Sequence, residues 1–157
     1  MFTIGYGIDV HKFAEERKLV IGGIEIPYKK GLLGHSDADV LIHAICDALL
    51  GAAGLGDIGT HFPDTEEKFR NIDSKKILAD VVSKIENLNF KIINIDSTII
   101  AQSPKFSSHI DSMRKTLAAI LKIEKQFINI KATTTEKLGF IGREEGIEAR
   151  AICLLEK

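Results

Sequence analysis

The first ten residues of the chain alternate between apolar side chains and other side chains. Phe2, Ile4, Tyr6, Ile8 and Val10 fall on one side of this alternation, with a period of two. Such a period is typical of a β-strand, in which successive side chains point to opposite faces. The pattern therefore predicts a strand at the start of the chain.

Apolar spacing distinguishes helices from strands along the rest of the chain. Stripes with a period near 3.6 predict helices, whereas β-branched runs and alternation predict strands. Asp37 and Ser74 are the expected N-caps of two helices, and Gly22-Gly23 predicts a bulge or bend within a strand. The predicted helices cover residues 37–50, 74–88 and 107–122, the strands 2–10, 18–26, 90–101, 127–134 and 147–155, and the loops 28–36, 54–66 and 135–146.

The order of these elements favours an α+β fold. Two strands, two helices, a strand, a helix and two strands predict a mixed β-sheet with helices packed on one face. No internal repeat or linker divides the chain, so we expect a single domain over residues 1–157. The other face of the sheet carries apolar residues as well, and we expect a homo-oligomer to cover it.

Composition narrows the possible functions. The 157 residues carry a net charge of −1, with 45% hydrophobic and 27% charged residues, which is ordinary for a soluble globular domain. No basic bias indicates nucleic-acid or membrane-surface binding. The sequence begins directly in a predicted strand, has no run of the roughly 20 apolar residues that a membrane span needs, and holds two widely spaced cysteines. We therefore expect a cytoplasmic protein.

Two histidines and a carboxylate form a candidate metal site. Asp9 and His11 lie two apart on the first predicted strand and so share a face. His43 lies on the first predicted helix, four residues from both Asp39 and Asp47, either of which is expected to orient its ring. Two imidazoles and one carboxylate, with an open fourth position, are typical of catalytic zinc. A chance D-x-H pair and an unrelated helix histidine remain the alternative at this stage.

Several polar segments suit a phosphorylated ligand. The pair His35-Ser36 precedes a helix, whose N-terminal N–H groups favour an anion. In the run KATTTEK at 131–137, hydroxyls and lysines can bind phosphate oxygens, and Glu136 can hold a hard divalent cation. A simple helix cap and a Thr-rich edge strand are the alternatives. Two further candidates, which can also be plain connections, are the loops at 57–64 and 102–105.

Taken together, these motifs resemble one enzyme family, the 2-C-methyl-D-erythritol 2,4-cyclodiphosphate synthases. The resemblance runs over essentially the whole chain. Ala38 departs from a glycine that is usual in the family, and Phe106-Ser107 departs from the commoner pair at that turn. The matching motifs are G-x-D-x-H at 7–11, G-L-L-x-H-S-D-x-D at 31–39, G-D-I-G-x-x-F-P-D-T at 56–65, D-x-T-I-I-A-Q-x-P-K at 96–105 and K-A-T-T-T-E-x-L-G-F-x-G-R-x-E-G-I at 131–147.

The resemblance implies an activity and an assembly. It implies a phosphorus–oxygen lyase of the non-mevalonate isoprenoid pathway. The implied substrate is 4-diphosphocytidyl-2-C-methyl-D-erythritol 2-phosphate, which is cyclised with release of CMP. The family also implies a homotrimer with sites at the subunit interfaces, bound zinc, a second divalent cation (magnesium or manganese) and an isoprenoid diphosphate on the trimer axis in some members.

The same resemblance implies roles for individual residues. Zinc is implied at Asp9, His11 and His43, the second cation at Glu136, and transition-state stabilisation at His35 and Thr134. The implied substrate-binding and ligand-binding positions are Asp9, Val10, His11, His35, Ser36, Asp57, Ile58, Gly59, Phe62, Pro63, Asp64, Thr65, Glu66, Ala101, Gln102, Ser103, Pro104, Lys105, Phe106, Ser107, Thr133, Thr134, Thr135, Glu136, Phe140 and Arg143.

Two other functions are compatible with the same side chains. A metal-dependent phosphohydrolase would use the triad to activate water. A non-catalytic, zinc-stabilised trimer would bind nucleotides or isoprenoid diphosphates without turnover. The cyclase is favoured because the D-x-H, TTTE and Q-x-P-K elements occur together, and neither alternative needs all three.

Overall fold

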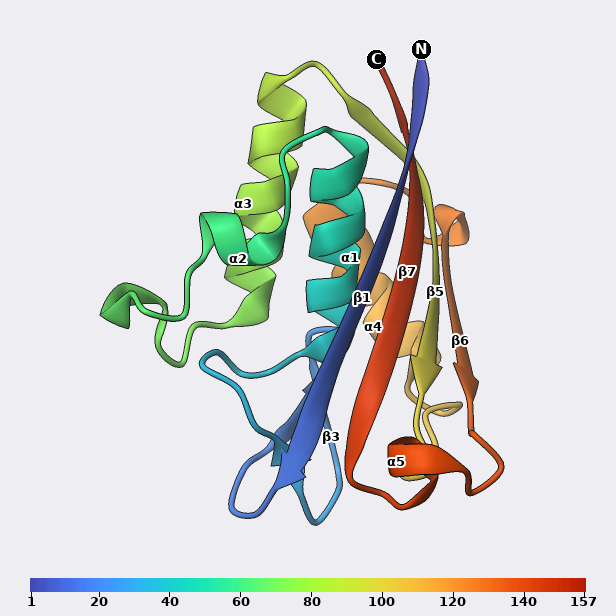
Figure 1. The fold of residues 1–157 in the computed structure, drawn as a ribbon. Coiled ribbons are helices and arrows are strands. Elements are labelled where there is room, and N and C mark those ends of the chain that lie inside the picture. The colour runs from blue at the N-terminus through green and yellow to red at the C-terminus, as the bar shows by residue number, and fades with distance from the viewer.

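The computed structural model describes residues 1–157 as a twisted mixed sheet with helices on one side (Figure 1). The sheet has five strands in the order β4-β1-β7-β5-β6, and only β5 and β6 run parallel to each other. This α+β arrangement confirms the predicted fold class. The strands are β1 (Phe2–Ala14), β4 (Gly31–Leu32), β5 (Lys91–Ile100), β6 (Ile128–Thr133) and β7 (Gly146–Glu156).

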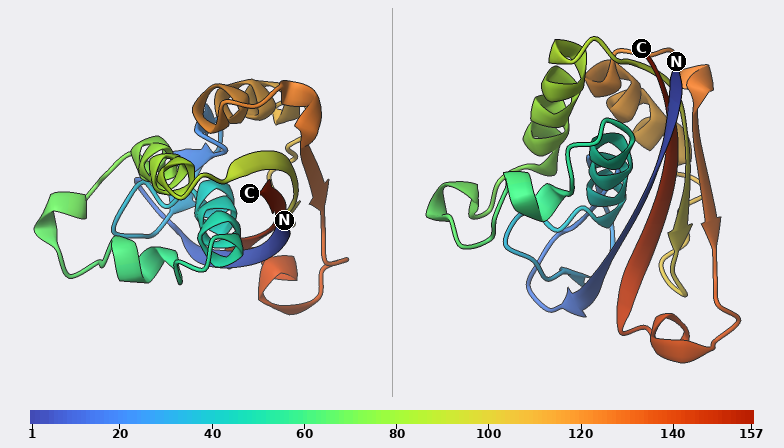
Figure 2. Two further views of the ribbon diagram at one scale, coloured as in Figure 1. Left: turned by 90° about the horizontal axis from the view of Figure 1, so that it is seen from above. Right: turned by 45° about the horizontal axis from the view of Figure 1, so that its top comes forward.

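Three longer helices cover one face of the sheet, as predicted. They are α1 (Val40–Ala52), α3 (Ser74–Asn87) and α4 (Ile110–Leu121). Figure 2 shows all three on the same side of the strands. Two short helices lie in connections, α2 (Ile58–His61) and α5 (Gly139–Gly142), and single 3-10 turns cover Glu67–Phe69 and Lys125–Phe127. None of the helices has the length and apolar character that crossing a membrane requires.

Helix α1 lies unusually close to β1. Gly5 and Gly7 face the helix, and a Cβ atom on either would come within 1.7 Å and 2.0 Å of the carbonyl oxygens of Ala48 and Ala44. Small residues on both elements therefore let the two backbones approach each other. The helix is buried on nearly every side by β1, β7 and α3, and it forms the centre of a single hydrophobic core.

The predicted strand at 18–26 is wrong in one respect. The segment forms a hairpin of two short strands, β2 (Leu19–Ile21) and β3 (Ile24–Ile26), that pair only with each other. Gly22 and Gly23 have φ values of 62° and 76°. Two consecutive positive φ values suit a two-residue hairpin turn, for which glycine is favoured. The two glycines therefore reverse the chain, where a bulge or bend had been predicted.

The predicted helix caps also need correction. Helix α1 begins at Val40 rather than at residue 37, and its N-cap is Asp39, whose carboxylate accepts the Ile42 N–H at 3.0 Å. The N-cap of α3 is Asp73, not Ser74. Helix α4 begins at Ile110, three residues later than predicted. The predicted loops at 28–36, 54–66 and 135–146 contain β4, α2 and α5.

The two chain ends lie side by side at one end of the sheet (Figure 1). Phe2 pairs with Glu156 in the β1–β7 ladder, and the amino group of Met1 donates to the Lys157 carbonyl oxygen at 2.8 Å. The ladder continues without a break to the pair Lys12–Gly146. Asp9 and His11 thus lie near the end of β1 that is remote from both termini.

Candidate metal and ligand site

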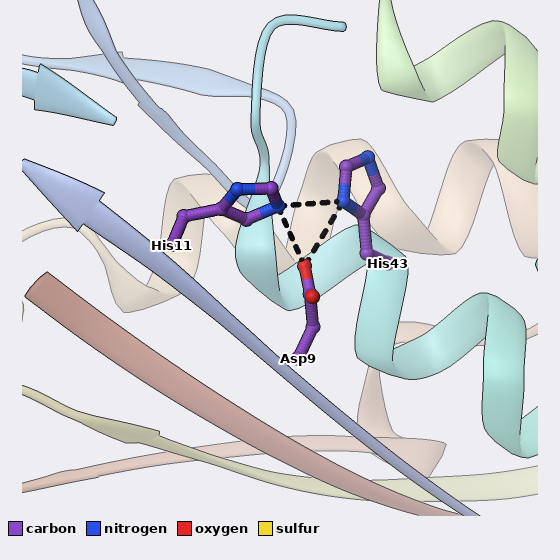
Figure 3. Close-up of side chains that lie close together, drawn as sticks. All are labelled: Asp9, His11 and His43. Carbon is purple, nitrogen blue, oxygen red and sulfur yellow. Dashed lines mark hydrogen bonds and ion pairs between the residues drawn. The ribbon is translucent and has the colours of Figure 1, made fainter. Parts of the chain in front are cut away.

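Asp9, His11 and His43 converge on one point, as Figure 3 shows. Asp9 and His11 come from the face of β1 that meets α1, and His43 comes from α1 itself. Asp9 Oδ2 lies 2.8 Å from His11 Nε2 and 3.0 Å from His43 Nδ1, and the two nitrogens are 3.2 Å apart. The structure therefore brings together all three predicted ligands of the first metal.

The donor set fits a tetrahedral divalent cation. Zinc bonds of about 2.0–2.1 Å place neighbouring donors about 3.3 Å apart. The three observed separations are only slightly shorter, so small side-chain movements would admit an ion. His11 and His43 also line a pocket, which leaves the fourth side of the set open to a ligand.

Hydrogen bonds within the triad stabilise the charged forms of Asp9 and His11. Burial opposes ionisation of Asp9, but hydrogen bonds with His11 and His43 outweigh it and hold the pKa of this carboxyl well below its usual range. Burial likewise lowers the pKa of His11, but the hydrogen bond to Asp9 outweighs it and raises that pKa overall. An anionic carboxylate thus lies between two imidazoles, which is the charge pattern that attracts a cation.

A backbone carbonyl group holds the Nδ1 side of the His11 ring. His11 Nδ1 lies 2.7 Å from the Leu33 carbonyl oxygen, which can only accept a hydrogen bond. With Nδ1 donating to this carbonyl oxygen, Nε2 is the nitrogen left for a cation, which would take the place of the hydrogen bond between Nε2 and Asp9 Oδ2. An outer contact of this kind is common for metal-binding histidines.

His43 is held by two serines, so the prediction that Asp39 or Asp47 orients it is wrong. His43 Nε2 lies 2.9 Å from Ser74 Oγ and 3.2 Å from Ser36 Oγ. Asp39 instead accepts the N–H groups of the Gly22-Gly23 turn and of α1. Asp47 accepts the N–H group that begins α2. Both carboxylates accept hydrogen bonds from backbone N–H groups and not from His43. Helical spacing alone does not reveal that these backbone donors compete with the histidine for the carboxylates.

A pocket of about 280 Å³ opens beside the triad. It brings His35, Ser36, Ile58, Phe62 and Asp64, which are predicted ligand-binding positions, next to the two histidines of the triad. Asp57 instead caps α2 through the Thr60 N–H, and Gly59, Pro63, Thr65 and Glu66 lie in the same segment without lining the pocket. Residues that sequence analysis missed complete the wall, namely Gly34, Phe69, Ile72 and Ile77.

A second pocket, of about 340 Å³, lies where the parallel strands β5 and β6 end. It is formed by the turn at 101–107 and by the run at 131–137, two segments that sequence analysis had selected separately. Gln102 also accepts the Lys137 N–H through Oε1 at 3.1 Å, which ties the two segments together. The lining residues are Ala101, Gln102, Pro104, Lys105, Phe106, Ser107, Ala132, Thr133 and Thr134.

The predicted ligand of the second cation does not join the triad within one chain. Glu136 follows β6, where Thr134 Oγ1 lies 3.2 Å from its Oε1, whereas the triad lies on β1 and α1. Strands β7 and β5 separate β1 from β6 in the sheet.

The remaining predicted positions line neither pocket. Val10 lies on the opposite face of β1, Ser103 against Glu144, Thr135 against the Leu138 carbonyl, Phe140 in α5 and Arg143 against Glu145.

An Asp/His group that could hold a metal ion, with an open side beside a pocket in an α+β domain, is the arrangement expected of a metal-dependent enzyme. The YgbB family matches residues 2–156, and the chain belongs to this family.

Curated relatives match at full length. A 2-C-methyl-D-erythritol 2,4-cyclodiphosphate synthase from Clostridium botulinum (strain Kyoto / Type A2) is 61% identical over 153 residues, which cover 98% of this chain and 99% of the relative. The synthase of the same name from Geobacillus thermodenitrificans (strain NG80-2) is 56% identical over 157 residues, covering 100% of this chain and 98% of the relative.

Solved structures share the fold. The bifunctional IspDF from Campylobacter jejuni superposes with a TM-score of 0.95 at 46% identity, covering 99% of this chain and 42% of that longer one. IspF from Plasmodium falciparum, in complex with CDP, gives a TM-score of 0.86 at 38% identity and covers 98% of this chain and 95% of that one. A CDP-bound 2C-methyl-D-erythritol-2,4-cyclodiphosphate synthase gives 0.90 at 35% identity, with 98% and 99% coverage.

Proposed function

We propose that this chain catalyses the reaction for which its relatives are named, the formation of 2-C-methyl-D-erythritol 2,4-cyclodiphosphate. The observation that carries this proposal is an Asp/His triad beside a pocket, in a chain 61% identical to such a synthase over 98% of its length. The enzyme is a phosphorus–oxygen lyase of the non-mevalonate isoprenoid pathway. Its substrate is 4-diphosphocytidyl-2-C-methyl-D-erythritol 2-phosphate.

The reaction exchanges one phosphorus–oxygen bond for another. An oxygen of the 2-phosphate bonds to the β-phosphorus, the bond from that phosphorus to the bridging oxygen breaks, and CMP leaves. The nucleophile is already an anion, so the protein needs no strong general base. Its task is to position the two ends of a flexible substrate and to stabilise the charge that develops between them.

We assign zinc to Asp9, His11 and His43, and a second cation, magnesium or manganese, to Glu136. The donor set of two imidazoles and one carboxylate supports zinc at the triad. A cation bound there supplies Lewis-acid polarisation of a phosphoryl oxygen. Glu136 is exposed and offers a carboxylate that phosphate-bound magnesium or manganese can use.

The remaining residues position the substrate and exclude water. Ile58, Phe62 and Phe69 give the triad pocket an apolar wall that limits water, the competing nucleophile. His35 lines the same pocket, and we assign it, with Thr134, to stabilisation of the transition state. The erythritol part is assigned to the loop residues Asp57–Gly59 and Phe62–Glu66.

The pocket at the ends of β5 and β6 is the proposed cytidine site. It offers the backbone and side chains of a turn at 101–107, together with the hydroxyls of Thr133 and Thr134. Lys105 adds a positive charge beside the diphosphate position. The CDP held by two structures of the same fold supports this assignment to the nucleotide.

We propose that the active unit is a homotrimer whose sites lie between subunits. Five of the apolar side chains on the uncovered face of β1 and β7 are 44–73% exposed, which is costly for a monomer. The separation of the triad from the β5–β6 pocket within one chain supports sites completed by a neighbour. These side chains are Ile4, Tyr6, Ile8, Val10 and Ile152.

On the axis of such a trimer, Phe140 and Arg143 are assigned to an isoprenoid diphosphate. Phe140 is 38% exposed and can meet an apolar chain, and the Arg143 guanidinium is exposed and can meet a phosphate.

The reaction is tested by ³¹P NMR on purified protein with zinc, magnesium and the cytidyl substrate. The proposal predicts two coupled resonances of a cyclic diphosphate together with an equal amount of CMP. Inorganic phosphate or a linear diphosphate would instead identify a phosphohydrolase. Zinc bound without any turnover would leave a nucleotide-binding module.

A further inference from the structure

A buried hydrogen-bond chain runs outward from His43, on the side of the ring away from the metal position. Ser74 at the start of α3 is completely buried, and its Oγ lies 2.9 Å from His43 Nε2. The hydroxyl group of Ser74 donates to Oδ1 of Asp37, and its backbone N–H donates to Oδ2 of the same carboxylate at 3.1 Å. Both oxygens of Asp37 therefore accept from Ser74.

The direction of these hydrogen bonds fixes the tautomer of His43. An ionised carboxylate can only accept, so the Ser74 hydroxyl proton points to Asp37. Ser74 Oγ then offers only lone pairs to the imidazole, and His43 Nε2 must carry the proton that joins them. With that proton on Nε2, the lone pair of Nδ1 is free for a metal.

The opposite tautomer has a competing advantage. His43 Nδ1 lies 3.0 Å from Asp9 Oδ2, and without other contacts this carboxylate would attract a proton to Nδ1. A proton on Nδ1 would block the metal position. The Ser74–Asp37 pair provides the opposing preference, because it stabilises a proton on Nε2.

Ser36 cannot provide this preference. Its Oγ is more distant from His43 Nε2, at 3.2 Å, and already accepts the Ala38 N–H at 3.1 Å. No carboxylate fixes its hydroxyl proton, so Ser36 can either donate to or accept from the ring. Only Ser74, whose hydroxyl group donates to Asp37, imposes one direction on its hydrogen bond with His43.

We propose that Asp37 and Ser74 are positioning residues of the metal centre, which set the tautomer and ring orientation of His43. This inference rests on the proposed metal triad. The Asp37 carboxylate is itself anchored, since Oδ1 also accepts the Asp39 N–H at 3.2 Å and the Asp37 N–H donates to the Ile72 carbonyl oxygen at 3.2 Å. Outer partners of this kind typically change metal affinity by about 10–100-fold.

The test measures zinc affinity of the full chain by competition with a chromophoric chelator. We expect Ser74→Ala and Asp37→Asn each to weaken zinc binding by about 10–100-fold. The d–d absorption of the cobalt-substituted protein should shift in both variants, because the His43 ring is no longer held. The second variant keeps the test decisive if the alanine at the buried position 74 prevents folding.

Asp73→Ala is the matched control. Asp73 caps the same helix through the Lys75 N–H at 2.9 Å, one residue before Ser74, but it forms no hydrogen bond with His43. Its replacement should lower the melting temperature and leave zinc affinity and the cobalt spectrum unchanged. Equal zinc loss in Asp73→Ala and Ser74→Ala would overturn the inference, because a displaced helix start would then explain both.

The possible failures are distinguishable. If the wild-type chain binds zinc, His43→Ala does not, and Ser74→Ala and Asp37→Asn bind it with wild-type affinity, the positioning role is refuted and the triad stands. If the wild-type chain binds no zinc, the proposed triad is refuted and the positioning role with it.

Discussion

Gly7 of β1 lies directly against the backbone of Ala44 in α1. A Cβ atom at Gly7 would be 2.0 Å from the Ala44 carbonyl oxygen and 2.7 Å from the Ala48 nitrogen. Ala44 is the neighbour of His43 in sequence, and Asp9 is two residues beyond Gly7. The missing side chain at position 7 therefore controls how closely His43 approaches Asp9.

Gly7→Ala should separate the strand from the helix and weaken both folding and metal binding. Backbone atoms cannot yield as a flexible side chain would, so we expect a loss of about 3 kcal/mol or more in unfolding free energy. Denaturant unfolding and zinc content measure the two effects. Gly51→Ala is the control: a Cβ there meets nothing within 4 Å, and it should add up to about 1 kcal/mol of helix stability.

Asp39 should make stability depend on pH. Burial raises the pKa of Asp39 to about 6, although the N–H groups of Ile42 and Gly23 oppose the rise. The unfolded value is about 3.9. Because the folded chain binds this proton more tightly, protonation stabilises the fold below about pH 6, and that stabilisation is lost as pH rises through 6.

Asp39→Asn cannot titrate and reveals this contribution. We expect the unfolding free energy of the wild type to exceed that of the variant by more at pH 5 than at pH 7.5. Between the unfolded and the folded pKa of Asp39, this difference changes by at most roughly 1.4 kcal/mol per pH unit. Denaturant titrations at the two pH values give the difference. A gap that stays constant, or that widens at high pH, would contradict the raised pKa.

His43→Ala should remove zinc and turnover together. The variant retains Asp9 and His11, but two donors bind a cation far more weakly than three. Metal analysis after gel filtration and the ³¹P NMR assay report the two losses. Full zinc content in this variant would mean that the triad is not the metal site.

Glu136→Ala should affect the binding of the two cations differently. The residue lies beyond β6, away from the triad, so we expect zinc content to stay at the wild-type value. Activity should become much less dependent on added magnesium or manganese, because the proposed protein ligand of that cation is gone. An unchanged response to either metal would remove Glu136 from this role.

Ile8→Glu should disrupt the assembly. Ile8 lies on the uncovered face of β1 and is 44% exposed in the single chain, so a charge there would be buried at the proposed subunit contact. We expect the mass in solution to fall from three times 17.3 kDa toward one chain, with loss of turnover. Ser83→Glu on the exposed side of α3 should leave the mass unchanged. A trimeric Ile8→Glu would place the contact elsewhere.

Local sequence signals were sufficient for most of the fold. Alternation over residues 2–10 correctly predicted β1, and apolar stripes correctly predicted α1, α3 and α4. Helix starts were less predictable, since Asp37, Asp39, Asp73 and Ser74 are all good cap residues and tertiary contacts decide between them. Asp37 in fact binds the start of α3, more than thirty residues away.

The three residues of the triad could be predicted from the sequence, but the residues that hold His43 in place could not. Strand and helix periodicity gave the faces of Asp9, His11 and His43, and the resemblance joined them. Ser74 was predicted only as a helix cap, because its contact with His43 depends on how α3 packs against α1. The separation of the two pockets likewise depends on strand order, which local patterns do not determine.

The pairing of Phe2 with Glu156 has a consequence for how this domain can be joined to others. Both ends of the chain leave the sheet at one point, about seven residues along β1 from Asp9, or roughly 23 Å. A protein fused at either terminus would therefore extend from the end of the molecule that is remote from the metal position. A short linker between Met1 and Lys157 would close the chain into a ring without moving a strand, so circular permutation is open to this fold.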